Sequence, residues 1–149
     1  MKKLVAYFSA SGVTAGKAAQ LAKAVGADLY EIAPAAKYTS ADLDWQNKNS
    51  RSTLEMNDGA SRPQLAQKAP DLAAYADVYI GFPIWWYTAP RIINTFLESG
   101  DFSDKRIVLF ATSGGSDIGK SVKDLKKQYP NLDIAGGKLL NGNVTEDII

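Results

Sequence analysis

The chain contains neither cysteine nor histidine among its 149 residues. Without cysteine there can be no disulfide, no thiolate metal site, no iron–sulfur cluster and no cysteine nucleophile. Without histidine, a Ser-His-Asp triad and the usual zinc ligand sets are excluded as well. Any redox or group-transfer reaction must therefore depend on a bound cofactor, or on carboxylates, hydroxyls, lysines and tyrosines.

The chain also lacks an excess of either charge and lacks a long apolar run. It has 17 Lys and Arg against 16 Asp and Glu, a net charge of +1, which does not indicate a nucleic-acid partner. The first apolar run ends at Phe8, too early for a signal-peptide core or a membrane span. We expect a cytoplasmic protein with no membrane partner. The length and the 46% hydrophobic content predict one domain, residues 1–149.

Short apolar runs alternate with stretches of helical periodicity. Strands are expected at 4–8, 29–32, 78–82 and 107–111, with a weaker one between 132 and 140. Helices are expected from Thr14 to Gly26, from Pro90 to Gly100 and from Ile118 to Pro130. This alternation predicts an α/β fold of three layers, a doubly wound parallel five-stranded sheet. Ligands of such sheets bind beyond the carboxyl ends of the strands.

Two regions depart from this alternation. Residues 33–76 form a long polar connection, in which the spacing of Thr39 and Asp42 resembles a capping box and predicts one helix. The final residues resemble the opening of a helix capped by Thr145, and we expect this C-terminal helix to be short or absent. One face of the sheet would then be less covered, in a monomer or a weak homodimer.

The first candidate loop follows the first strand and holds Ser9, Ser11, Gly12 and Thr14. Hydroxyls and a glycine before a helix N-terminus can form an anion site. A Walker A loop is excluded, because the glycine spacing is one residue short and Ala18 stands where a hydroxyl must hold magnesium. The dinucleotide fingerprint GxGxxG is absent too. A phosphate monoester site and a plain turn both remain open.

The second candidate loop follows the third strand with Pro83, Ile84, Trp85, Trp86 and Tyr87. Three large aromatic residues in a surface loop cannot all face the core. Exposing them is unfavourable unless something covers them. A flat aromatic ligand would do so, and so would a partner protein or a dimer interface.

The third candidate loop combines hydroxyl side chains with glycines after the fourth strand, at Thr112, Ser113, Gly114, Gly115, Ser116 and Asp117. Glycine lets the backbone approach a ligand closely, and an aspartate can cap the next helix. Alone, the loop is an ordinary strand-to-helix connection. Its expected place beside the other two loops favours a role in binding.

Together the three loops resemble those of the flavodoxin family, specifically short bacterial flavodoxin-like proteins with a Pro-Ile-Trp-Trp loop. The resemblance implies a strand order 2-1-3-4-5 with FMN bound non-covalently. It implies that Ser9, Ser11, Gly12, Val13 and Thr14 hold the phosphate. Residues 83–87 would line and stack on the flavin, and residues 112–117 would close its other edge.

Two functions follow from this resemblance. The first is electron transfer between redox partners, and the alternative is an FMN-dependent NAD(P)H oxidoreductase acting on a quinone or similar small acceptor. Typical flavodoxins are strongly acidic, whereas this chain is balanced, so steering by net charge is not supported. A response-regulator receiver is disfavoured because Ser9, Ser11 and Thr112 occupy the places of its acidic residues. An aromatic interaction module without a cofactor is the last alternative.

Overall fold

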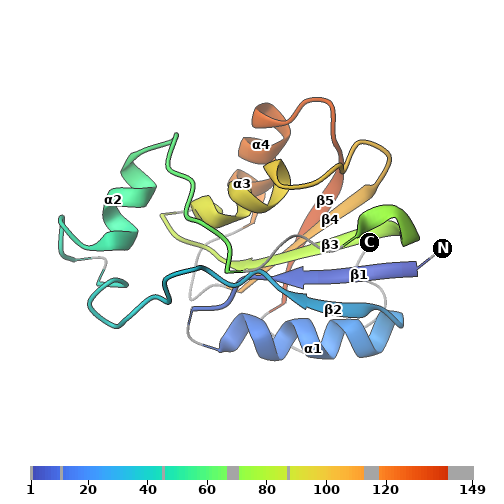
Figure 1. Ribbon diagram of the computed structural model, residues 1–149, viewed down its shortest axis with the longest axis horizontal. Helices are drawn as coiled ribbons and strands as arrows, with labels where there is room; N and C mark the ends of the chain where they lie inside the picture. The colour runs from blue at the N-terminus through green and yellow to red at the C-terminus, as the bar shows by residue number, and fades with distance from the viewer. Residues whose placement is uncertain are drawn as a thin grey trace.

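The protein, analysed as a computed structural model, contains one parallel five-stranded sheet (Figure 1). The structure describes residues 2–10, 12–44, 46–66, 71–86, 88–112 and 118–140. The strands are β1 (Lys2–Tyr7), β2 (Asp28–Glu31), β3 (Tyr75–Pro83), β4 (Arg106–Thr112) and β5 (Asp133–Leu139). Their order is β2-β1-β3-β4-β5 and every pair is parallel, which confirms the predicted fold. All carboxyl ends therefore meet at one edge, on the left in Figure 1.

Helices cover both faces of the sheet (Figure 1). The helical elements are α1 (Val13–Val25), α2 (Arg51–Asn57), the short 3-10 helix η1 (Leu72–Ala74), α3 (Arg91–Glu98) and α4 (Gly119–Gln128). α1 lies on one face, and α3 and α4 lie on the other. Ala18, Leu21 and Ala22 of α1 are buried, and Gly26 ends that helix with a left-handed φ of 68°, as a C-terminal glycine does.

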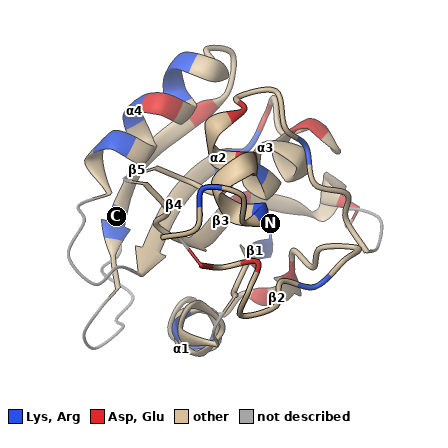
Figure 2. Ribbon diagram, turned by 90° about the vertical axis from the view of Figure 1, so that its left-hand side faces the viewer, with Lys and Arg blue, Asp and Glu red and all other residues tan. Residues whose placement is uncertain are grey.

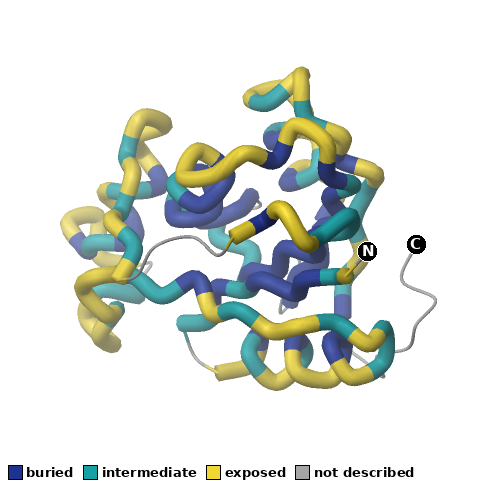
Figure 3. The backbone as a smooth tube through the Cα atoms, turned by 45° about the vertical axis from the view of Figure 1, so that its right-hand side comes forward, coloured by how far each residue is buried: buried dark blue, intermediate teal, exposed yellow. Residues whose placement is uncertain are grey.

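Two hydrophobic clusters correspond to these two faces. The cluster on the α1 side holds Val5, Leu21 and Phe110, and the larger one on the α3 and α4 side holds Phe82 and Ile93. Figure 3 shows the strands as the buried centre of the molecule. The strand residues are buried on both sides because parallel strands carry helices on both faces.

One close approach inside the sheet requires a glycine. Gly81 of β3 pairs with Phe110 of β4, whose ring lies over it. A Cβ atom at position 81 would lie 2.1 Å from Cζ of Phe110. No side chain fits there unless the ring moves.

The helix predicted at Thr39–Asp42 is wrong. The two residues do bond reciprocally, Thr39 N to Asp42 Oδ2 and Asp42 N to Thr39 Oγ1, but a turn follows instead of a helix. Asp44 and Asn47 accept bonds from backbone N–H groups two residues further on, which competes with helix formation. The helix of this segment, α2, begins only at Arg51.

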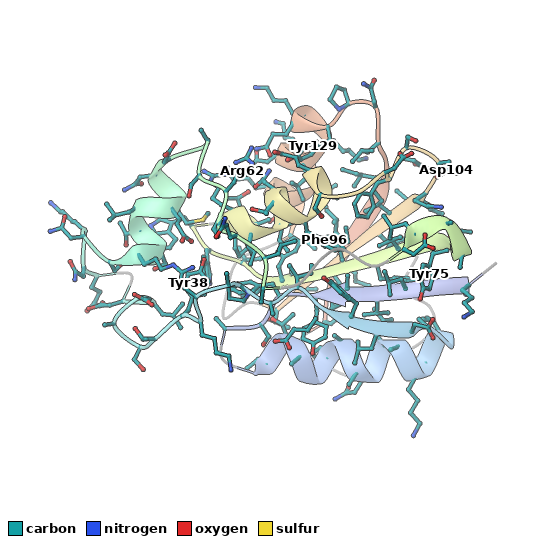
Figure 4. The ribbon with its side chains drawn as sticks, viewed as in Figure 1. Tyr38, Arg62, Tyr75, Phe96, Asp104 and Tyr129 are labelled. Atoms are coloured by element: carbon teal, nitrogen blue, oxygen red, sulfur yellow. The ribbon has the colours of Figure 1, made fainter. Side chains whose placement is uncertain are left out.

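Residues 33–66 form a segment whose two ends are joined to each other and which also contacts α3. Ala35 and Ala66 donate backbone hydrogen bonds to Gln64 O and Ala33 O, which join the two ends. Arg62 Nε lies 3.0 Å from Glu98 Oε2 on α3 (Figure 4). The segment is thereby held beside the carboxyl edge.

The expected C-terminal helix lies outside the described residues. None of the helices in the described ranges is long and apolar enough to cross a membrane.

Candidate functional site

Described residues from each of the three candidate loops meet at the carboxyl edge of the sheet, Thr112 being the one from the third. Thr14 Oγ1 lies 2.8 Å from Thr112 Oγ1, and both side chains are buried. Ile84 N donates to Thr112 O over 3.1 Å. Thr112 at the end of β4 thus contacts both the loop after β1 and the loop after β3.

The first loop presents a helix N-terminus without a capping side chain. Gly12 precedes α1 with a φ of 94°, a left-handed conformation that favours glycine. Its N–H donates to Ser9 Oγ over 3.0 Å, which fixes the turn before the helix. The first-turn N–H groups of a helix have no intrahelical acceptors, and α1 has no acidic residue in that turn. The arrangement suits an anion at the end of the helix.

The second loop makes a tight turn that carries Trp86 at its tip. Trp85 and Thr88 exchange two backbone hydrogen bonds of 2.9 and 3.0 Å. Trp86 between them has a positive φ of 49°, a rare conformation for a bulky residue that costs about 1–2 kcal/mol. Its side chain is 38% exposed. The turn therefore holds a large aromatic ring at the surface at an energetic cost.

Trp85 has a different environment. Its ring packs edge-on against Phe8 and Tyr38, with ring centroids 5.6 and 5.4 Å away, and it joins the larger hydrophobic cluster. The two tryptophans, equivalent in the sequence, are thus separated into a packed ring and an exposed one.

Tyr38 is a residue of this edge that no sequence pattern singled out. It lies between α2 and the carboxyl edge (Figure 4), where the Arg51 guanidinium stands 3.8 Å from its ring centroid. Its hydroxyl donates to Glu55. Burial, together with the Glu55 carboxylate, raises the pKa of Tyr38 well above its ordinary value. The ring therefore stays neutral and fixed against Trp85.

Thr88 and Asp124 form a second contact that sequence reasoning missed. Thr88 Oγ1 donates to Asp124 Oδ2 on α4 over 2.8 Å, and Lys120 Nζ donates to the same oxygen over 2.7 Å. Burial alone would raise the pKa of Asp124, but these bonds and the nearby charges of Lys120 and Arg91 hold it below its ordinary value. The ionised carboxylate ties the tryptophan turn to α4.

The predicted site residues that the structure describes lie at this edge: Ser9, Gly12, Val13, Thr14, Pro83, Ile84, Trp85, Trp86 and Thr112. The remaining ones lie outside the described residues: Ser11, Tyr87, Ser113, Gly114, Gly115, Ser116 and Asp117. Within the described ranges, no group of three or more acidic side chains is placed to hold a metal ion.

A family model and several solved structures match this chain. The flavodoxin family model matches residues 2–149. A "putative flavoprotein" from Bacteroides uniformis ATCC 8492 is 56% identical, with 99% of this chain and 94% of that chain covered and a TM-score of 0.95. A second one, from Bacteroides eggerthii DSM 20697, is 57% identical over 97% of this chain and 91% of that chain, with a TM-score of 0.94.

A more distant structure shares the fold. It is a flavoprotein in complex with FMN from Lactobacillus acidophilus NCFM, 22% identical over 93% of this chain and 92% of that chain, with a TM-score of 0.74. A comparison with curated proteins gave no match. The match to the family model over residues 2–149 shows that this chain belongs to the flavodoxin family.

Proposed function

We propose that this chain binds FMN non-covalently at the carboxyl edge and carries electrons between redox partners. The observation that carries the proposal is that Thr112 contacts both the uncapped N-terminus of α1, through Thr14, and the loop that exposes Trp86, through Ile84. A ligand with a phosphate at one end and a flat ring at the other matches this pair. Two solved relatives at 56% and 57% identity, each named a "putative flavoprotein", add support.

The phosphate would be held by the first loop. The donors available there are the backbone N–H groups of the first turn of α1 and the hydroxyl of Ser9. Thr14, whose hydroxyl is buried against Thr112 Oγ1, would contribute its backbone N–H. Val13 is 56% exposed, so its contribution would be its backbone N–H and not its side chain. A nest of neutral donors at a helix N-terminus suits a phosphate monoester.

The flavin ring would be covered by Trp86. A bulky residue in a left-handed conformation persists only where its surroundings enforce it, and such residues cluster at ligand-binding sites. Here the Trp85–Thr88 backbone pair and the bond from Thr88 to Asp124 enforce it. Trp85, packed on Phe8 and Tyr38, would support the turn from below.

The chemistry supplied by the bound FMN is the uptake and release of one or two electrons. The chain's own residues would bind and orient the group and restrict water around its ring. No protein nucleophile is required for this function, which agrees with the absence of cysteine and histidine.

The test is a titration of apoprotein with FMN, followed by tryptophan fluorescence and the visible spectrum. We expect quenching and a yellow protein at one FMN per chain. A colourless protein whose fluorescence ignores FMN would overturn the proposal.

The near-neutral net charge does not favour a charge-steered electron carrier, so the second candidate function is an FMN-dependent NAD(P)H oxidoreductase. Steady-state oxidation of NADH and NADPH by the lone holoprotein with a quinone separates the two functions. An electron carrier gives no turnover above free FMN, and sustained turnover would assign the oxidoreductase function instead.

A further inference from the structure

The outward side of α4 is a basic surface. Lys120, Lys123, Lys126 and Lys127 are all exposed, and we call these four residues the α4 lysine face. The helix holds four of the 17 basic residues and one of the 16 acidic residues, so it carries +3 while the rest of the chain carries −2. The balanced net charge thus conceals a strong local asymmetry, visible along α4 in Figure 2.

The helix is connected to the proposed flavin site. Asp124, at its centre, accepts the hydrogen bond from Thr88 of the tryptophan turn. Each of the four lysines lies within four residues of Asp124, which is at most about 6 Å along a helix axis. This separation of backbone positions is comparable to the Debye length of about 8 Å at physiological ionic strength, so the lysine charges are incompletely screened at Asp124, which holds Thr88.

Helix stability explains only part of this surface. Lys126 and Lys127 lie in the last turn, where cations favour the helix dipole. Lys123 is in the middle, and its spacing to Lys126 and Lys127 places like charges on neighbouring positions, which destabilises a helix by a few tenths of a kcal/mol. Among the described residues, only Lys120 of the four has an ion pair, with Asp124. Three cations therefore face solvent beside the site.

We propose that the α4 lysine face is the docking surface for an acidic redox-partner protein. The inference rests on the proposed electron-transfer function and names the partner's chemistry, a cluster of carboxylates. Complementary charge beside the cofactor would raise the association rate and align the partner with the ring. Docking on α4 would also place the partner on the helix that holds the Trp85–Thr88 turn.

The experiment follows the oxidation of reduced holoprotein by ferricyanide in stopped flow, at increasing ionic strength. Control by the net charge and control by the α4 lysine face predict opposite changes of the oxidation rate with salt. A phosphate adds about −2 to the +1 of the chain, so net charge alone predicts repulsion of the ferricyanide anion and a rate that rises with salt. The α4 lysine face predicts attraction and a rate that falls with salt.

Matched variants locate the effect. Lys123→Glu with Lys127→Glu removes charge from the face, and Lys2→Glu with Lys23→Glu makes the same change at the start of β1 and the last turn of α1. At low salt we expect the α4 variant to react roughly tenfold more slowly than wild type, and the control variant to change far less. Equal slowing in both variants, or a wild-type rate that rises with salt, would overturn the proposal.

Two further readouts keep the result interpretable. Unchanged FMN affinity and circular dichroism of both variants show that fold and site are intact, and protein that fails to retain FMN would refute the proposed function itself before this assay begins. In the same assay, poly-L-glutamate should slow oxidation of wild type but not of the α4 variant. If a short DNA duplex of equal charge slows the oxidation more strongly than poly-L-glutamate does, the α4 lysine face binds nucleic acid, and the proposal of an acidic protein partner is overturned.

Discussion

The buried pair of hydroxyls between Thr14 and Thr112 should behave as a coupled unit. Their oxygens lie 2.8 Å apart, and the two side chains are 1% and 5% exposed. Replacing either threonine by valine keeps the shape but leaves the other hydroxyl buried without this partner. Such an orphaned group costs about 1–3 kcal/mol, whereas replacing both partners is nearly neutral.

A double-mutant cycle on the apoprotein measures this coupling. With a urea slope of about 2 kcal/mol/M, each single variant should lose about 1 M in its unfolding midpoint, and the double variant should lie close to wild type. The double variant should therefore fall short of the sum of the two single losses by that whole sum, about 2–6 kcal/mol. Additive losses in the double variant would refute the reasoning, because they would mean that the hydroxyls do not depend on each other.

Other residues lead to three further predictions. Trp86→Ala should weaken FMN binding by about 1–3 kcal/mol while the apoprotein's free energy of unfolding stays unchanged. Trp85→Ala should lower the free energy of unfolding by about 1–3 kcal/mol because it loses two aromatic pairs. The same change in FMN affinity and in stability for both variants would contradict this division. Gly81→Ala should cost about 1–3 kcal/mol in thermal unfolding, partly recovered by Phe110→Leu, and an unchanged melting temperature would show that the ring moves freely. The lowered folded pKa of Asp124 stabilises the protein above the unfolded value of about 3.9 and ceases to do so as pH falls through the folded pKa. The deficit of Asp124→Asn, about 1 kcal/mol, should thus be present in full in urea unfolding at pH 7 and shrink as the pH falls below about 3.9, and a deficit that does not change with pH would refute it.

Elements set by local pattern were predictable from the sequence. α1 shows its buried face in Ala18, Leu21 and Ala22, and its end in Gly26, because helical periodicity and a left-handed stop are both local properties. The strands were predictable for the same reason, since continuous apolar runs indicate burial on two faces. The strand order came from the family resemblance and not from periodicity.

The long polar segment was not predictable because tertiary contacts fix it. α2 has seven residues, too few to show a clear period, and its last carbonyls are held by Arg91 of α3, whose Nη2 lies 2.9 Å from Met56 O. Tyr38 owes its place to Trp85 and Arg51, which are far from it in sequence. A capping pattern at Thr39 formed as predicted, yet side chain–backbone bonds beyond it prevented a helix.

The sequence allowed a prediction of which loops form the candidate site, but not of which side chains in them are packed and which are exposed. Adjacent residues such as Trp85 and Trp86 look alike in a sequence. Only the backbone pairing with Thr88 and the positive φ of Trp86 separate the packed ring from the exposed one. The role of Thr88 and Asp124 depends on a contact across 36 residues, for which neither residue carries a local signal.

The most direct test of the account compares the affinity of the apoprotein for FMN and for riboflavin, which has the same ring without the phosphate. If the first loop binds the phosphate through several charge-assisted hydrogen bonds, each about 1.5–3 kcal/mol, then FMN should bind at least about 100-fold more tightly. Inorganic phosphate should then compete with FMN. Equal dissociation constants for the two flavins would contradict the central claim, because the ring would then bind without the helix N-terminus of α1.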